Sequence, residues 1–173
     1  MQRQIVILNV AFLVIRLVGL GMAAHGAQKL FGWFGGHGLA GTGGFFEKLG
    51  FRPGRFFAFA AGAGEVGGGV LTAVGFGGPI GPALIVLVMI VAAVTVHVRN
   101  GYLQGVNGFE LNAVYVALAL ALGYVGFGDY SLDHMLHLSW TCLAAPTRVT
   151  ITFAVAAAIA LVNVALRRSQ APT

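Results

Sequence analysis

The sequence predicts an all-α integral membrane protein, a bundle of four transmembrane helices followed by a fifth, C-terminal transmembrane helix. Of its 173 residues, 58% are hydrophobic and 9% are charged, whereas about 25% of an average soluble domain is charged. Such a chain cannot cover a water-facing surface with polar groups. The 27 glycines agree with this prediction, because glycine lets helices in lipid approach each other closely. The length suits one compact domain.

Charge and cysteine content exclude several functions. The net charge is +5, but the cations are spread over loops and helix ends, and the longest basic run is Arg167-Arg168. This pattern is typical of membrane topology rather than of nucleic-acid binding. The single cysteine, Cys142, excludes an intramolecular disulfide, a cysteine redox pair and a thiolate zinc site. The first apolar run is too long for a signal peptide, so we expect it to be retained.

Five stretches are suited to cross the membrane, since a span needs about 20 mainly apolar residues. After the first, residues 25–55 mix glycine with aromatic side chains. This mixture is typical of a short re-entrant or interfacial helix or of an aromatic belt at the lipid surface. Ser131 is suited to cap a short surface helix before the last span. The predicted spans are 5–24, 56–76, 79–98, 109–127 and 147–166.

Lysine and arginine on the predicted loops orient these five spans. One side of the membrane receives the loops after the first and third spans together with the C-terminus, and it holds most of the cations. The positive-inside rule then places the N-terminus outside and the C-terminus in the cytoplasm. The cytoplasmic cations would be Lys29, Lys48, Arg52, Arg55, Arg99, Arg167 and Arg168, and the outer ones Arg3 and Arg148.

Two charged residues fall near the middle of predicted spans, Arg16 in the first and Glu65 in the second. A charge at that depth costs about 2.5–3.5 kcal/mol on insertion scales unless it has a partner. At about 1.5 Å per residue, both lie about 16 Å below the outer face of a core about 30 Å thick. Consecutive helices usually pack side by side. We therefore predict an Arg16–Glu65 ion pair, either a clamp that fixes helix register or part of a ligand or proton site.

A second polar group is predicted at the cytoplasmic ends of three spans. His25, Gln28 and Lys29 have the i, i+3, i+4 spacing of one helix face, and the third and fourth spans add a histidine, an amide and a carboxylate. With the flat ring of Trp33, these groups could hold a quinone head group. The alternative is that they are ordinary polar residues at headgroup level. The predicted ligand-binding residues are His25, Gln28, Lys29, Trp33, His97, Asn100 and Glu110.

Two further interpretations have weaker support. Asp133, His134 and His137 could hold a metal ion on a surface helix, but no further ligand completes the set, so no metal site is predicted. His25 and His97 could ligate a haem between spans, but both fall close to the membrane interface. Neither interpretation displaces the quinone hypothesis.

Several segments resemble the DoxX family of small bacterial membrane proteins. Their pattern covers about residues 5–136 and implies a four-helix membrane bundle in this part of the chain. Residues 137–173 would then form a linker and the extra C-terminal helix, which departs from the family pattern. The most specific segments are 25–36 (HGAQKLFGWFGG) and 44–51 (GFFEKLGF), and the others are 13–19, 61–68, 96–97 and 130–133.

The resemblance implies a redox role in the bacterial inner membrane, because some relatives are subunits of a thiosulfate:quinone oxidoreductase and others are linked to thiol-stress complexes. Family membership alone does not fix a reaction. Our first hypothesis is a membrane subunit of a quinone-linked oxidoreductase that binds a quinone or a small anion. The sequence has no recognisable flavin, nicotinamide or iron–sulfur motif, so electrons would come from a partner subunit, and no covalently bound cofactor is expected. The alternatives are a non-catalytic anchor or assembly subunit and a small-solute transporter gated by Arg16 and Glu65.

Overall fold

The computed structural model describes residues 2–138 and 146–167, and the regular elements in these ranges are all helical. Cys142, Arg168 and most of the predicted linker lie outside the described residues. The α-helices are α1 (Gln2–Arg16), α2 (Val18–Phe31), α3 (Gly38–Lys48), α4 (Gly54–Val74), α5 (Ile80–Ala92), α6 (Glu110–Val125), α7 (Leu132–Met135) and α8 (Pro146–Ala165). Short helical turns are η1 (Trp33–Gly35), the π-helical η2 (Ala93–His97), η3 (Val98–Asn100) and η4 (Gln104–Val106).

Four helices in the described part of the chain are long and apolar enough to cross a membrane. The predicted C-terminal span is one of them. The fourth predicted span corresponds to α6, whose 16 residues cover only about 24 Å, less than a hydrocarbon core of about 30 Å. The prediction of five spans is therefore confirmed for four. These are Gln2–Phe31, which combines α1 and α2, Gly54–Val74, Ile80–Asn100 and Pro146–Ala165.

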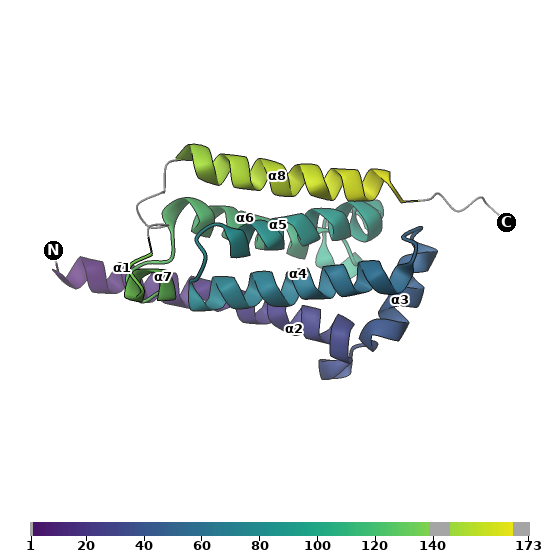
Figure 1. Ribbon diagram of the computed structural model, residues 1–173, viewed down its shortest axis with the longest axis horizontal. Helices are drawn as coiled ribbons and strands as arrows, with labels where there is room; N and C mark the ends of the chain where they lie inside the picture. The colour runs from purple at the N-terminus through teal and green to yellow at the C-terminus, as the bar shows by residue number, and fades with distance from the viewer. Residues whose placement is uncertain (1, 139–145, 168–173) are drawn as a thin grey trace.

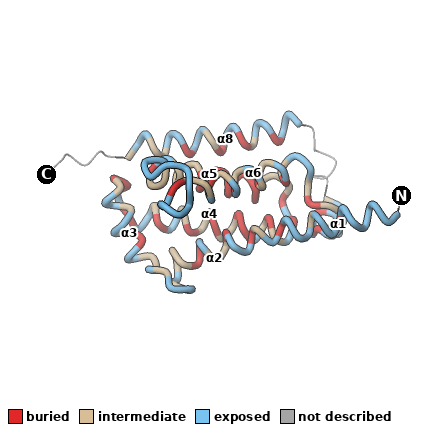
Figure 2. Tube along the Cα trace, turned by 180° about the vertical axis from the view of Figure 1, so that it is seen from behind, coloured by how far each residue is buried: buried red, intermediate tan, exposed pale blue. Residues whose placement is uncertain are grey.

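The long helices lie side by side in an elongated bundle (Figure 1). Helix α4 lies between α2 and α5, and α5 also packs against α6 and α8. Helix α3 lies across one end of the bundle, which we call the α3 end, and α7 lies at the opposite end, the α7 end (Figure 1). Buried positions face the interior, whereas the outer faces are exposed (Figure 2). The buried core surrounds α5 and includes Met22, Ile85, Met89, Tyr115 and Phe153.

Glycines bring α2 and α4 into close backbone contact. A Cβ added to Gly26 would lie 2.6 Å from the carbonyl oxygen of Gly62, and one added to Gly69 would lie 2.6 Å from the backbone nitrogen of Ala23. Small residues allow such close approach in membrane bundles. These contacts fix the antiparallel register of the two helices, and hence which polar residues of α2 can meet those of α4.

Helix α3 is the short helix predicted between the first two spans. It approaches α4 closely, because a Cβ on Gly43 would lie 3.1 Å from the backbone nitrogen of Arg55. A row of aromatic rings continues this contact: Phe46 lies 5.6 Å from Phe51, which lies 5.3 Å from Phe57, measured between ring centroids. The completely buried ring of Phe51 thus fixes α3 across the end of the bundle.

Candidate functional site

A cavity of about 340 Å³, which we call the inner cavity, lies near the α3 end between α2, α3, α4, the end of α5 and α8. Its volume is within the range of small-molecule sites, and its apolar lining with few polar groups is typical of them. Phenylalanine side chains of α3 and α4 form much of one wall. The lining residues are Lys29, Phe45, Phe46, Leu49, Phe57, Ala60, Ala61, Glu65, Leu87, Val88, Val91, Ala92, Thr95, Val96, His97, Asn107 and Asn163.

An ion pair between α2 and α4 forms the charged part of this lining. Lys29 Nζ lies 2.5 Å from both Oε1 and Oε2 of Glu65. The Glu65 side chain is only 3% exposed and that of Lys29 is 29% exposed, because the lysine stem can extend along the helix while its charge reaches the carboxylate. An isolated buried carboxylate would be strongly disfavoured, and the bidentate lysine contact compensates its charge.

The structure corrects the predicted Arg16–Glu65 ion pair. Arg16 Nη2 instead donates to the carbonyl oxygen of Tyr130 at 2.8 Å, and Arg16 Nη1 occupies the space that a Cβ on Gly75 would need. Gly75 follows Glu65 by ten residues, about 15 Å along a helix. The depth count failed because the first helix begins at Gln2 and extends to Phe31, and because glycine contacts, rather than equal depth, set its register against α4.

Arg16 and Asp133 lie on two sides of the turn that follows α4. Arg16 is 1% exposed, and its Nε and Nη1 have no hydrogen-bond partner among the described residues. Asp133 is 2% exposed, its backbone nitrogen donates to Gly75 O, and its carboxylate accepts from the backbone nitrogens of Gly77 and Gly78 at 2.9 and 2.8 Å. The Asp133 carboxylate thus fixes the turn after α4, while Arg16 is hydrogen-bonded to Tyr130 O.

His97 supplies a hydrogen-bonding group to the inner cavity. It ends the π-helical turn η2, a form often found at functional sites. Its Nδ1 lies 3.0 Å from the carbonyl oxygen of Asn107. A carbonyl oxygen only accepts, so Nδ1 is the donor in this contact, and in the tautomer that it requires Nε2 is an acceptor.

A second cavity, the vestibule, has a volume of about 300 Å³ and lies on the other side of Lys29. His25 Nδ1 donates to Gln28 Oε1 at 3.0 Å, and Gln28 Nε2 donates to the carbonyl oxygen of Phe34 at 3.1 Å. This chain of hydrogen bonds holds η1 against α2 although Phe34 has a positive φ of 51°. The vestibule is lined by His25, Gln28, Lys29, Gly35, Gly36, His37, Thr42, Phe45 and Phe46.

The predicted binding residues are therefore divided between two cavities. Lys29 lines both, His97 lines only the inner cavity, and His25 and Gln28 line only the vestibule. This separation also gives no support to haem ligation by His25 and His97. Trp33 is 59% exposed and lines neither cavity.

Two other predicted residues stabilise the loop before α6. Asn100 Nδ2 donates to the carbonyl oxygen of Asn107 at 3.1 Å, and Glu110 Oε2 accepts from the backbone nitrogen of Gln104 at 2.8 Å. Neither Asn100 nor Glu110 lines the inner cavity. The sequence prediction placed both residues at this end of the bundle, as the structure does. It did not predict that Phe46 and Glu65 line the inner cavity. For Phe46, the segment GFFEKLGF was the available indication.

Comparison with known proteins identifies one family. The sequence model of the DoxX family matches residues 11–98, just over half of the 173 residues. The chain belongs to the DoxX family. No curated protein and no solved structure matches it. The matched range contains Lys29, Glu65 and His97, so the ionisable residues that line the inner cavity lie within the DoxX region of this membrane protein.

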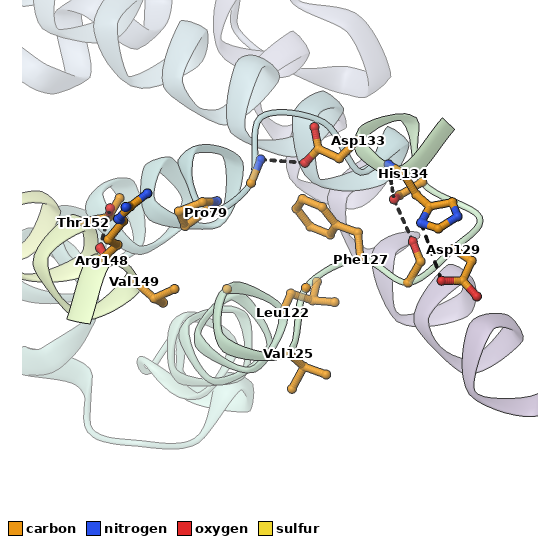
Figure 3. A pocket seen from close by; sticks show the side chains of 15 residues that line it. Pro79, Leu122, Val125, Phe127, Asp129, Asp133, His134, Arg148, Val149 and Thr152 are labelled. Carbon is orange, nitrogen blue, oxygen red and sulfur yellow. Dashed lines mark hydrogen bonds and ion pairs between the residues drawn. The ribbon is translucent and has the colours of Figure 1, made fainter. Parts of the chain in front are cut away.

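A third cavity of this DoxX protein, about 320 Å³, lies at the α7 end between α6, α7 and α8 (Figure 3). Its buried polar side chains already have backbone partners: Asp133 binds the turn after α4, and Ser131 caps α7 by accepting from His134 N at 3.2 Å, as the sequence predicts. Its rim residues Asp129, His134 and Arg148 are exposed. Among the described residues, no buried ion pair lines this cavity, so the inner cavity is the stronger candidate site.

The metal interpretation placed Asp133, His134 and His137 in one ligand set. The structure directs Asp133 to the backbone of the turn after α4, and it places His134 Nδ1 3.7 Å from Asp129 Oδ1. In the described ranges, no group of three or more histidine, cysteine, aspartate or glutamate residues could hold a metal ion.

Proposed function

We propose that this DoxX protein is a membrane subunit of a quinone-linked oxidoreductase and that its inner cavity binds the quinone head group. The observation that carries this proposal is the combination, in one apolar cavity, of a buried lysine–carboxylate pair and a histidine acceptor. Membership of the DoxX family supports a link to oxidoreductase complexes. Electrons would come from a partner subunit, since the chain has no recognisable motif for an electron-carrying cofactor.

The cavity has groups suited to both oxidation states of a quinone. Two short contacts join Lys29 to Glu65, and an ammonium group has three N–H donors, so one remains for a quinone carbonyl. His97 Nε2 can accept from a hydroxyl of the quinol. The rings of Phe45, Phe46 and Phe57 offer flat apolar contacts. A neutral head group leaves the charge balance of the ion pair unchanged.

The proposed orientation places the α3 end in the cytoplasm. That end carries Lys48, Arg52, Arg55, Arg99 and Arg167, whereas Arg3 and Arg148 lie toward the α7 end. The positive-inside rule favours this arrangement in a bacterial inner membrane, with the N-terminus outside. A C-terminal reporter that is active only on the outer side would contradict it.

The second candidate function is a non-catalytic anchor or assembly subunit. Long apolar faces favour it: Ile7, Leu8 and Val14 of α1 are 57%, 56% and 59% exposed, and such faces suit either lipid or a partner helix. In this case Lys29 and Glu65 would only fix helix packing. The transporter hypothesis loses its basis, since it required contact between Arg16 and Glu65.

Quinone binding by the full chain in lipid nanodiscs separates these functions. We expect a benzoquinone with a short alkyl tail to bind wild-type protein, and we expect Lys29→Met and His97→Ala each to weaken binding about three- to tenfold. One net hydrogen bond is worth about 0.5–1.5 kcal/mol. His25→Ala is the matched control, because His25 lies outside the inner cavity. Equal affinity in all four proteins would remove the proposal and favour the anchor.

A further inference from the structure

The inner cavity and the vestibule are separated by a thin wall of side chains. Three residues line both cavities: Lys29 from α2 and the adjacent Phe45 and Phe46 from α3. The two phenylalanine rings meet edge to face, with centroids 6.3 Å apart.

Lys29 is the polar residue of this wall. Its ammonium group lies 2.5 Å from both oxygens of Glu65, and Glu65 lines the inner cavity but not the vestibule. The lysine side chain is 29% exposed, against 3% for the glutamate. The buried carboxylate therefore holds a partly exposed side chain at the boundary between the cavities.

Most of the lining surface of the vestibule is apolar, but five of its nine lining residues have polar or charged side chains. His25, Gln28, His37 and Thr42 line it together with Lys29. The hydrogen bonds from His25 to Gln28 and from Gln28 to Phe34 O hold η1 at its rim. Gly36 packs directly on Gln28, since a Cβ there would lie 2.5 Å from Gln28 Cα. The rim of the vestibule is thus held by fixed groups, whereas Lys29 is held by one ion pair.

We propose that the vestibule is the aqueous port of the inner cavity and that the Lys29–Glu65 ion pair closes it. When Lys29 leaves Glu65, water, protons and small hydrophilic molecules reach the inner cavity from the α3 end. Phe46 stays in place because it packs on the buried Phe51. This inference rests on the proposed role of the inner cavity as the ligand site, and it assigns to Lys29 control of access in addition to ligand contact.

Thiol labelling tests the port without any quinone. Val88 lines the inner cavity and is 6% exposed, so a charged reagent that cannot enter lipid reaches it only through a cavity. Val88→Cys is introduced with Cys142→Ser in the full chain and reconstituted in nanodiscs. We expect slow modification by a charged methanethiosulfonate, and we expect Lys29→Ala to accelerate it about tenfold. His134→Ala, at the α7 end and outside both cavities, should leave the rate unchanged.

Two further variants keep this test decisive. Glu65→Gln removes the negative charge that holds Lys29 and keeps the lysine. It should also accelerate labelling, and it replaces Lys29→Ala if that variant does not fold. His97→Ala enlarges the inner cavity at a residue that does not line the vestibule, and acceleration by this variant alone would overturn the proposed port. Equal labelling rates in all variants would overturn it too. The labelling experiment contains no quinone. Its result therefore tests the port even if the separate binding experiment finds no quinone binding.

Discussion

The ammonium nitrogen of Lys29 lies 2.5 Å from both carboxylate oxygens of Glu65, although the two residues are 36 positions apart. The contact joins the end of α2 to the middle of α4, and it lies in the wall between two cavities. Glycine contacts between the same helices bring the two groups together. The same ion pair thus joins α2 to α4, supplies the charged groups of the inner cavity and lies at its boundary with the vestibule.

Breaking this ion pair should destabilise the bundle. Lys29→Met leaves a buried carboxylate without its counter-charge, and we expect the free energy of unfolding to fall by about 3 kcal/mol. This value is at the lower end of the range for broken buried pairs, because Lys29 is partly exposed. The double variant Lys29→Met/Glu65→Met should recover most of this loss, because no uncompensated charge remains. Unfolding free energies of the four proteins in a double-mutant cycle measure the coupling. If the double variant lost as much stability as the two single variants together, the predicted coupling between Lys29 and Glu65 would be contradicted.

Arg16 and Glu65 should behave as independent sites. They lie near opposite ends of the α2–α4 contact, so the losses from Arg16→Met and Glu65→Gln should add within about 0.5 kcal/mol in the double variant. The same measurement on Lys29 and Glu65 provides the coupled comparison. A coupling of several kcal/mol between Arg16 and Glu65 would restore the ion pair predicted from the sequence.

Two glycines of α4 should respond in opposite ways to alanine. A Cβ on Gly69 would lie 2.6 Å from the backbone nitrogen of Ala23, whereas one on Gly67 meets nothing within 4 Å. We expect Gly69→Ala to cost about 1–3 kcal/mol by overpacking, and Gly67→Ala to be neutral or stabilising by up to about 1 kcal/mol, because alanine favours the helix. Thermal unfolding in one detergent compares them. Equal melting temperatures of the two variants would show that α2 and α4 are less closely packed than in the structure.

Asp133 should be the residue of α7 that matters most for stability. Asp133→Asn removes the charge and leaves one oxygen to accept from Gly77 N and Gly78 N, where the carboxylate has two. We expect a loss of about 1–3 kcal/mol. His134→Ala is the control in the same helix, since its side chain is 52% exposed, and it should change the unfolding free energy by less than about 0.5 kcal/mol. A loss of the same size in both variants would remove the role assigned to the carboxylate.

Much of the fold follows from the apolar runs in the sequence. The first, second, third and last predicted spans correspond to helices long enough to cross a membrane, because run length and composition decide this property. The predicted span 109–127 is shorter in the structure. Phe109 N donates to Gly101 O in the loop before α6, and α6 ends at Val125, before Gly126 with its positive φ of 85°. Such loop closure depends on tertiary contacts and leaves no periodic pattern.

The site was predicted only in part. Lys29 and His97 were expected at one depth near the α3 end, and the inner cavity includes both. The partner of Glu65 was predicted incorrectly, because the depth count assumed that two spans of equal thickness align at their ends. Register depends instead on the close contacts of Gly26 and Gly69, which composition alone does not place. The roles of Asn100 and Glu110 in the loop before α6 likewise require the folded structure.

Photoaffinity labelling measures most directly whether the inner cavity binds a quinone. The full chain in nanodiscs is irradiated with an azido-substituted benzoquinone, and labelled peptides are identified by mass spectrometry. We predict adducts on peptides that contain Phe46, Ala61 and Val91, three cavity-lining residues from α3, α4 and α5, and we predict that excess unlabelled quinone and Lys29→Met both reduce them. Adducts confined to the cavity at the α7 end, near Phe127, or adducts that excess quinone does not reduce, would contradict the account.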